Sequence, residues 1–95
     1  MSGIRVVTET ESPNGWRFVI AAPRADSTAG EHEMTLAWVD YEFWSHGMHS
    51  PSRVAEAVVG AVIGAQPERE LPARFDASTA RRWVQGLDAL VRERL

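Results

Sequence analysis

Residues 4–22, IRVVTETESPNGWRFVIAA, contain the pattern that decides the fold. A run rich in β-branched residues, 4–11, is followed by SPNG (residues 12–15) and then by a second apolar run, 15–22. Proline fixes φ, and Asn-Gly tolerates the positive φ that a tight hairpin turn requires. The segment therefore predicts two antiparallel strands joined by that turn.

The strand pattern continues beyond this hairpin. Residues 23–30 predict a polar loop, and residues 31–39 alternate as a third strand would, so we expect an antiparallel meander. Alternation places the bulky side chains on one face, and we expect that face to be the core. Its expected members are Ile4, Val6, Thr8, Trp16, Phe18, Ile20, Met34, Leu36 and Trp38.

The second half of the chain has the spacing and capping signals of helices. Asp40 is a candidate N-cap for a short helix over residues 41–46. Ser50 as N-cap, with Pro51 at the first helical position, predicts a longer helix that reaches about residue 65.

A C-terminal helix is expected after a connector over residues 67–72. Asp76 is its candidate N-cap, and Gly86 is expected to bend or divide it. We therefore expect one α+β domain over residues 1–95, with the sheet in 1–39 and the helical half in 40–95. Its three-stranded antiparallel meander (β-β-β) would be followed by two to three helices packed on one face.

Composition narrows the class of protein. The 95 residues suit a single domain, and the absence of cysteine excludes disulfides and thiolate zinc sites. There is neither a signal-peptide pattern nor an apolar run near the ~20 residues of a membrane span, so we expect a cytoplasmic protein. The net charge of −3 gives no general attraction to nucleic acid or anionic membrane. Every basic residue is Arg, a bias that we attribute to a GC-rich bacterial genome.

The segments DYEFW (residues 40–44) and ARFD (residues 73–76) form the most distinctive pattern. With them the chain resembles small bacterial proteins of unknown function that carry a similar DYxxW…ARFD arrangement over most of their length. The resemblance implies a shared fold and assigns no activity.

His46 and His49, with Asp40 and Glu42 nearby, form the one candidate metal cluster in the sequence. Imidazole suits zinc, nickel or copper, but the Gly and Ser-Pro breaks prevent the two histidines from sharing a helical face. Ser45 and His46 are too close in sequence to act as nucleophile and base. We expect no catalytic residue, no metal and no cofactor, and keep a small metal-dependent enzyme as an alternative.

The C-terminal arginines form the one basic concentration. A phosphate-binding surface would use Arg74, Arg81, Arg82 and Arg92. Acidic neighbours dilute this charge, and arginine near a helix C-terminus is already favoured by the helix dipole. We interpret the cluster as a solvated face, with nucleic-acid binding as the first alternative function.

Four aromatic residues gather within seven positions where the third strand meets the first helix: Trp38, Tyr41, Phe43 and Trp44. The favoured interpretation is that they plug the junction between sheet and helix. The alternative is an exposed partner-binding anchor formed by Tyr41 and Trp44 with His46 beside them.

The second candidate contact surface is the sheet face that the helices leave uncovered. We define this open sheet face by Arg5, Val7, Arg17, Val19 and Ala37. Ala21 and Val39 would extend its apolar centre, and Glu9 and Glu33 would pair with its arginines. The leading hypothesis is a non-catalytic interaction or accessory module, whose partner is an unidentified protein or a second copy in a homodimer.

Overall fold

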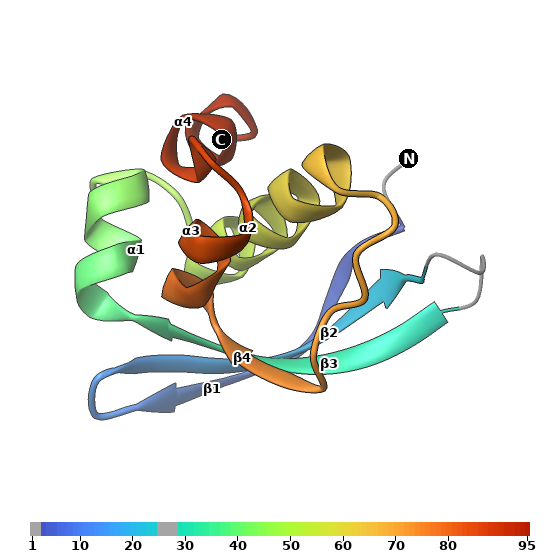
Figure 1. Ribbon diagram of the computed structural model, residues 1–95. Coiled ribbons are helices and arrows are strands. Elements are labelled where there is room, and N and C mark those ends of the chain that lie inside the picture. Colours follow the sequence, from blue (N-terminus) through green and yellow to red (C-terminus); the bar gives the residue numbers. More distant parts are fainter. Residues whose placement is uncertain (1–2, 25–28) are drawn as a thin grey trace.

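The computed structural model describes residues 3–24 and 29–95, and it has helices on one side of a four-stranded sheet (Figure 1). The strand order is β1-β2-β3-β4. The first two pairs are antiparallel, and β3 pairs with β4 in parallel. The strands are β1 Arg5–Ser12, β2 Gly15–Pro23, β3 Ala29–Ala37 and β4 Arg74–Asp76. The α+β class is confirmed; the loop expected at 23–30 lies partly outside the described residues.

The hairpin between β1 and β2 forms where the SPNG turn predicts it. Ser12 pairs with Gly15, so the turn itself has two residues. A side chain at Gly15 has no room, because an added Cβ would lie 2.9 Å from the Cα of Ala37 on β3. The glycine therefore allows β2 and β3 to pair up to the end of the sheet.

The fourth strand was not expected from the sequence. Its three residues are too few to show an alternating pattern, and it joins the sheet through non-local contacts. Met34 of β3 pairs with Phe75, and the backbone N–H of Glu33 donates to Ala73 O at 2.8 Å. Because β4 enters after the helical crossover from β3, it lies parallel to that strand.

The helices are α1 Trp38–Ser45, α2 Pro51–Ala65, α3 Ala80–Trp83 and α4 Leu87–Glu93, with a 3-10 helix, η1, at Ala77–Thr79. Within the described residues, no helix is long and apolar enough to cross a membrane. The number of helical segments exceeds the two or three expected, because the C-terminal helix is divided.

Two of the three expected helix starts are confirmed. Ser50 Oγ accepts the Arg53 N–H at 3.1 Å, and Asp76 Oδ2 accepts the Ser78 N–H at 3.0 Å. Asp40 is not an N-cap, because α1 begins earlier and Asp40 lies in its first turn. Gly86, at φ 75°, separates α3 from α4 as expected.

The core lies between the sheet and the helices, and most of its expected strand residues are confirmed. The side chains of Phe18, Ile20, Met34 and Leu36 are almost fully buried. Trp38 is one exception: it is 52% exposed, because the chain leaves β3 at Ala37 and the alternation ends there.

A β-bulge corrects the predicted faces of β1. The register shifts between Val6 and Thr8, so beyond Val7 each side chain changes to the other side of the sheet. Thr8 pairs with Val19 on the uncovered side, whereas Glu9 pairs with Phe18 and accepts a hydrogen bond from Ser52 of α2. Thr8 is therefore not a core residue, and Glu9 is not on the open sheet face.

Candidate functional site

The largest concentration of exposed apolar side chains lies on α1 and the turn that follows it. We call Trp38, Val39, Phe43 and Met48 the α1 patch. Val39 is 73% exposed, Phe43 46% and Met48 81%. Among the described residues, Val7 is the one further large hydrophobic side chain in the exposed class. Glu42 and His46 line a shallow hollow together with Trp38, Val39 and Phe43 of the patch.

Aromatic contacts fix the start of α1. The Trp38 ring lies 4.7 Å from the Trp16 ring and 5.8 Å from that of Tyr41, centroid to centroid. The backbone N–H of Trp38 donates to Asn14 O at 2.9 Å, which connects α1 to the hairpin turn. Tyr41 in turn donates its hydroxyl to His49 O at 2.5 Å. Trp38 is thus both exposed and held in position.

The second exposed ring, Phe43, is held by two arginines. The Arg92 guanidinium lies 4.5 Å from the ring centroid and donates to Phe43 O at 3.1 Å. Arg81 approaches the same ring at 5.6 Å. Contacts of this kind are worth about 0.5–1 kcal/mol at exposed sites. They restrict the ring while leaving almost half of it accessible.

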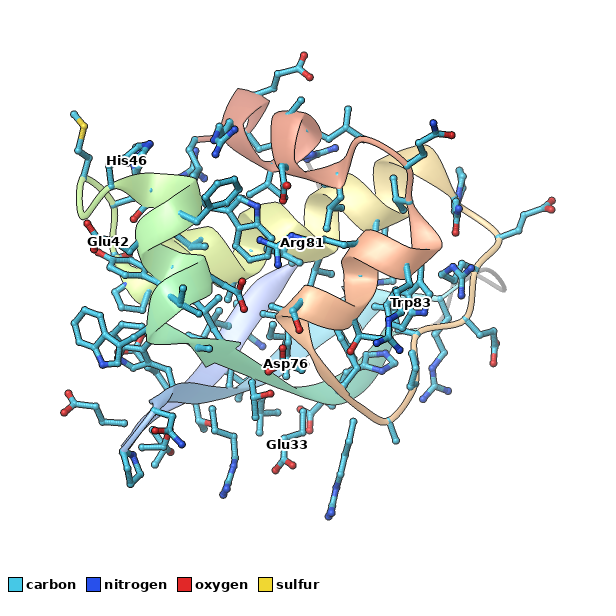
Figure 2. The ribbon with its side chains drawn as sticks, turned by 60° about the vertical axis from the view of Figure 1, so that its left-hand side comes forward. Glu33, Glu42, His46, Asp76, Arg81 and Trp83 are labelled. Carbon is cyan, nitrogen blue, oxygen red and sulfur yellow. The ribbon has the colours of Figure 1, made fainter. Side chains whose placement is uncertain are left out.

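Arg81 also joins α1 to α4. It donates to Asp40 Oδ1 at 2.8 Å and to Asp88 Oδ1 at 2.9 Å, and its guanidinium lies 4.6 Å from the buried Trp44 ring. Figure 2 shows Arg81 between α1 and the C-terminal helices, whereas Glu42 and His46 lie on the outer side of α1. We call Arg81, Asp40, Asp88 and Trp44 the Arg81 network.

The network favours the charged forms of Asp88 and Arg81. Burial raises the pKa of Asp88, but hydrogen bonds from Arg81 and Trp44 outweigh burial and hold this pKa below its usual value. Burial likewise opposes the charge of Arg81, yet its two carboxylate partners raise the pKa of the guanidinium. The inner side of α1 is therefore anchored by ion pairs.

The aromatic residues of the alternative interpretation, the exposed anchor, are not the exposed ones. Tyr41 and Trp44 are buried, which agrees with the favoured interpretation that they plug the junction and contradicts the alternative. His46 is exposed as expected. The sequence interpretation missed Trp38 because it placed this residue in a strand, and it did not single out Phe43 within the expected helix. Had the helix been started at Trp38, the 3–4 spacing of residues 39, 43 and 46 would have indicated an outer stripe.

The open sheet face is present but differs from its expected composition. Arg5, Val7 and Arg17 are exposed, and Val19 and Ala37 are half-buried. Its predicted ion pairs do not form: Arg17 lies between Thr10 and Thr35, and Glu33 pairs with Arg74 at 3.5 Å. Val39 belongs to α1 and not to this face.

The arginines proposed for phosphate binding have other contacts. Arg81 and Arg92 meet at Phe43, while Arg74 lies on β4 beside Glu33. Arg82 is exposed on α3. Since Arg81 is held between two carboxylates, little of its charge remains for a phosphate. Nucleic-acid binding stays an untested alternative.

The two histidines of the candidate metal cluster end α1 and lie in its turn. His46 is the C-cap of α1 with φ 52°, and His49 is half-buried. Across residues 3–24 and 29–95, no three His, Cys, Asp or Glu side chains are grouped so that they could hold a metal ion. The geometry gives the metal-dependent alternative no support.

No family model matches the chain, and comparisons with curated proteins and with solved structures found no match either. The resemblance to proteins with a DYxxW…ARFD arrangement stays a prediction. Function must therefore be argued from the geometry of the surfaces.

Proposed function

We propose that this protein is a non-catalytic interaction module that binds a protein partner through the α1 patch. The observation that carries the proposal is the gathering of exposed Trp38, Val39, Phe43 and Met48 on one helix and its turn. Contiguous exposed apolar surface of this kind marks binding sites in soluble proteins. Burying it gains about 25 cal/mol for each Å² removed from water.

The way the two rings are held supports the same proposal. Trp38 lies against Trp16 and Tyr41, and Phe43 lies beneath Arg92 and Arg81. A ring already fixed in the free protein loses little conformational entropy on binding. Rigid aromatic anchors inside a polar rim are typical of binding hot spots. Glu42, His46 and Arg92 supply that rim.

The experiment compares the wild-type protein with two valine substitutions in quantitative affinity capture from the native cell extract. Val39→Glu places a charge in the α1 patch at a side chain that is 73% exposed, so it leaves the core intact. Val19→Glu is the control and places the same charge on the open sheet face. We expect a partner that wild type and the Val19 variant retain and the Val39 variant loses. Equal retention by both variants would refute the use of the patch.

Self-association through the open sheet face is the second candidate function. Exposed Val7 lies next to the bulge there, and half-buried Val19 follows on β2. Two such faces could meet in a two-fold dimer. Sedimentation velocity tests this directly: a dimer in the wild type that Val19→Glu makes monomeric supports it, and a monomeric wild type removes it.

A further inference from the structure

A polar hollow lies at the end of β3 opposite to α1, and it shares no residue with the α1 patch. Its volume is about 260 Å³. The end of β2, the beginning of β3 and the connector that joins α2 to β4 enclose it. Figure 1 shows that connector running from the end of α2 down to the sheet, where it enters β4. We call this space the connector hollow; Arg24, Glu31 and His32 line it from the strand side, and Arg69, Glu70 and Leu71 line it from the connector.

His32 is the one polar side chain in the inward-facing row of β3 that continues through Met34 and Leu36. It is only 8% exposed, and its Nδ1 lies 2.9 Å from Pro72 O. A carbonyl oxygen can only accept, so Nδ1 carries a proton, and a ring without a second proton offers a lone pair at Nε2.

His32 is one of the residues that line the connector hollow. The His32 side chain makes no other hydrogen bond within the described part of the chain, and no described side-chain nitrogen or oxygen is sealed from solvent without a partner. The accessible part of the ring therefore includes Nε2. A nearly buried histidine with one nitrogen fixed and the other unbonded is a built acceptor that faces a cavity.

Two hydrogen bonds between β3 and the connector preform the hollow. Glu33 N–H donates to Ala73 O at 2.8 Å, next to the bond between His32 and Pro72 O. Two successive residues of β3 thus hold two successive residues of the connector. A cavity fixed in this way needs no rearrangement to receive a small molecule.

Two arginines at the hollow form no ion pair among the described residues, although Glu31 and Glu70 also line it. The Arg24 side chain lies over Gly30, where an added Cβ would collide with its Nε, so the glycine makes room for the guanidinium. The Arg69 guanidinium lies 5.0 Å from the Trp83 ring and donates to Gln66 Oε1. Neither arginine belongs to an ion pair within the described part of the chain. Their remaining donors suit a carboxylate.

We propose that the connector hollow binds a small carboxylic acid with a hydroxyl or amino group next to its carboxylate. The carboxylate would accept hydrogen bonds from Arg24 and Arg69, and the hydroxyl or amino group would donate to His32 Nε2. A volume of 260 Å³ equals about eight or nine liquid waters, which is room for an acid of lactate or serine size. The site is independent of partner binding by α1.

The test is a titration of the ¹⁵N-labelled protein followed by NMR, with L-lactate and L-serine as probes. Acetate is the matched comparison because it has the carboxylate without the donor. We expect saturable shifts at the amides of residues 69–73 and at the His32 ring nitrogens. Binding of lactate or serine should be about tenfold tighter than that of acetate, the usual effect of one hydrogen bond to a prepared acceptor.

Two substitutions and one control complete the design. His32→Phe keeps a ring but removes Nε2, so lactate should bind no better than acetate. Arg24→Gln removes an exposed charge without touching the core and should weaken the binding of all three acids. Arg17→Gln, on the opposite face of the sheet, should change nothing. If acetate and lactate bind equally, if no shift saturates, or if the two arginine variants behave alike, the proposal is wrong.

Discussion

Replacing Arg81 with Met tests how much of the stability depends on the Arg81 network. Methionine keeps an unbranched apolar stem over Trp44 but removes both hydrogen bonds to carboxylates. Asp40, whose side chain is 12% exposed, then loses the arginine that compensates its charge. Asp88 keeps only its hydrogen bond from Trp44 Nε1 at 2.7 Å.

The expected loss follows from the burial of the two pairs. A hydrogen bond to a charged group contributes about 1.5–3 kcal/mol when buried, so two give an upper limit of about 3–6 kcal/mol. The Arg81 and Asp88 side chains are 32% and 37% exposed, and solvent screening reduces their share to about 1 kcal/mol or less. We expect Arg81→Met to lower the free energy of unfolding by about 2–3 kcal/mol near pH 7.

The pH dependence gives the sharper result. Because the folded pKa of Asp88 is depressed, its contribution is present above the unfolded value of about 3.9 and is lost as the pH falls through the folded value. Urea unfolding followed by tryptophan fluorescence should therefore show the gap between wild type and Arg81→Met narrowing below about pH 4. The control is Arg82→Met, an exposed neighbour, which should stay within about 0.5 kcal/mol of wild type. A gap that is the same at neutral and acid pH would refute an ionic origin.

Three further substitutions test the helix caps, the packing of α2 and the core, each by urea unfolding near neutral pH. Ser50→Ala removes the cap on the Arg53 N–H and should cost about 1 kcal/mol; an unchanged midpoint would contradict the capping role. Gly64→Ala should gain about 0.5 kcal/mol from helix propensity, because its Cβ would meet only the flexible tip of Arg94, and a loss would show that this contact matters more. Met34→Ala, at a fully buried position, should cost about 2–5 kcal/mol, and a loss below about 1 kcal/mol would contradict its place in the core.

The features that the sequence predicted correctly are those encoded by neighbouring residues. The SPNG turn, the Ser50 cap and the break at Gly86 each depend on the conformational preferences of a few adjacent residues. The inward row of β2 follows from simple alternation, and the helix side of the sheet could be chosen from it. These local signals were enough for the α+β class.

The features that the sequence did not predict depend on distant partners. No residue near Val7 gives a sequence signal for the bulge, which moves the side chains of the rest of β1 to the opposite face of the sheet. Asp40 has the chemistry of an N-cap, but its partner in the structure is Arg81, 41 residues away. The strand β4 exists because Glu33 and Met34 accept its pairing, and three residues carry no periodic signal of their own.

The sequence interpretation misplaced the α1 patch because it began the first helix three residues too late, at residue 41 instead of Trp38. Starting the helix after Asp40 left Trp38 in a strand, where alternation directs it to the core. Residues 37–39 are compatible with the two-residue period of a strand and with the 3.6-residue period of a helix, so the sequence alone does not decide between the two structures. In the helix that begins at Trp38, Tyr41 and Trp44 face inward. Val39 and Phe43 face outward.

The contacts that position the α1 patch are also contacts that stabilise the fold, and this decides which variants can separate the two roles. Phe43 is held by Arg81 and Arg92, so changing Phe43 or Arg81 would disturb the packing of α1 against α4 along with the surface. Val39 and Met48 have no comparable inward contacts and are the most exposed members of the patch. A loss of binding in a variant at either of these two positions, with an unchanged free energy of unfolding, can therefore be assigned to the surface itself, because no buried pair is altered.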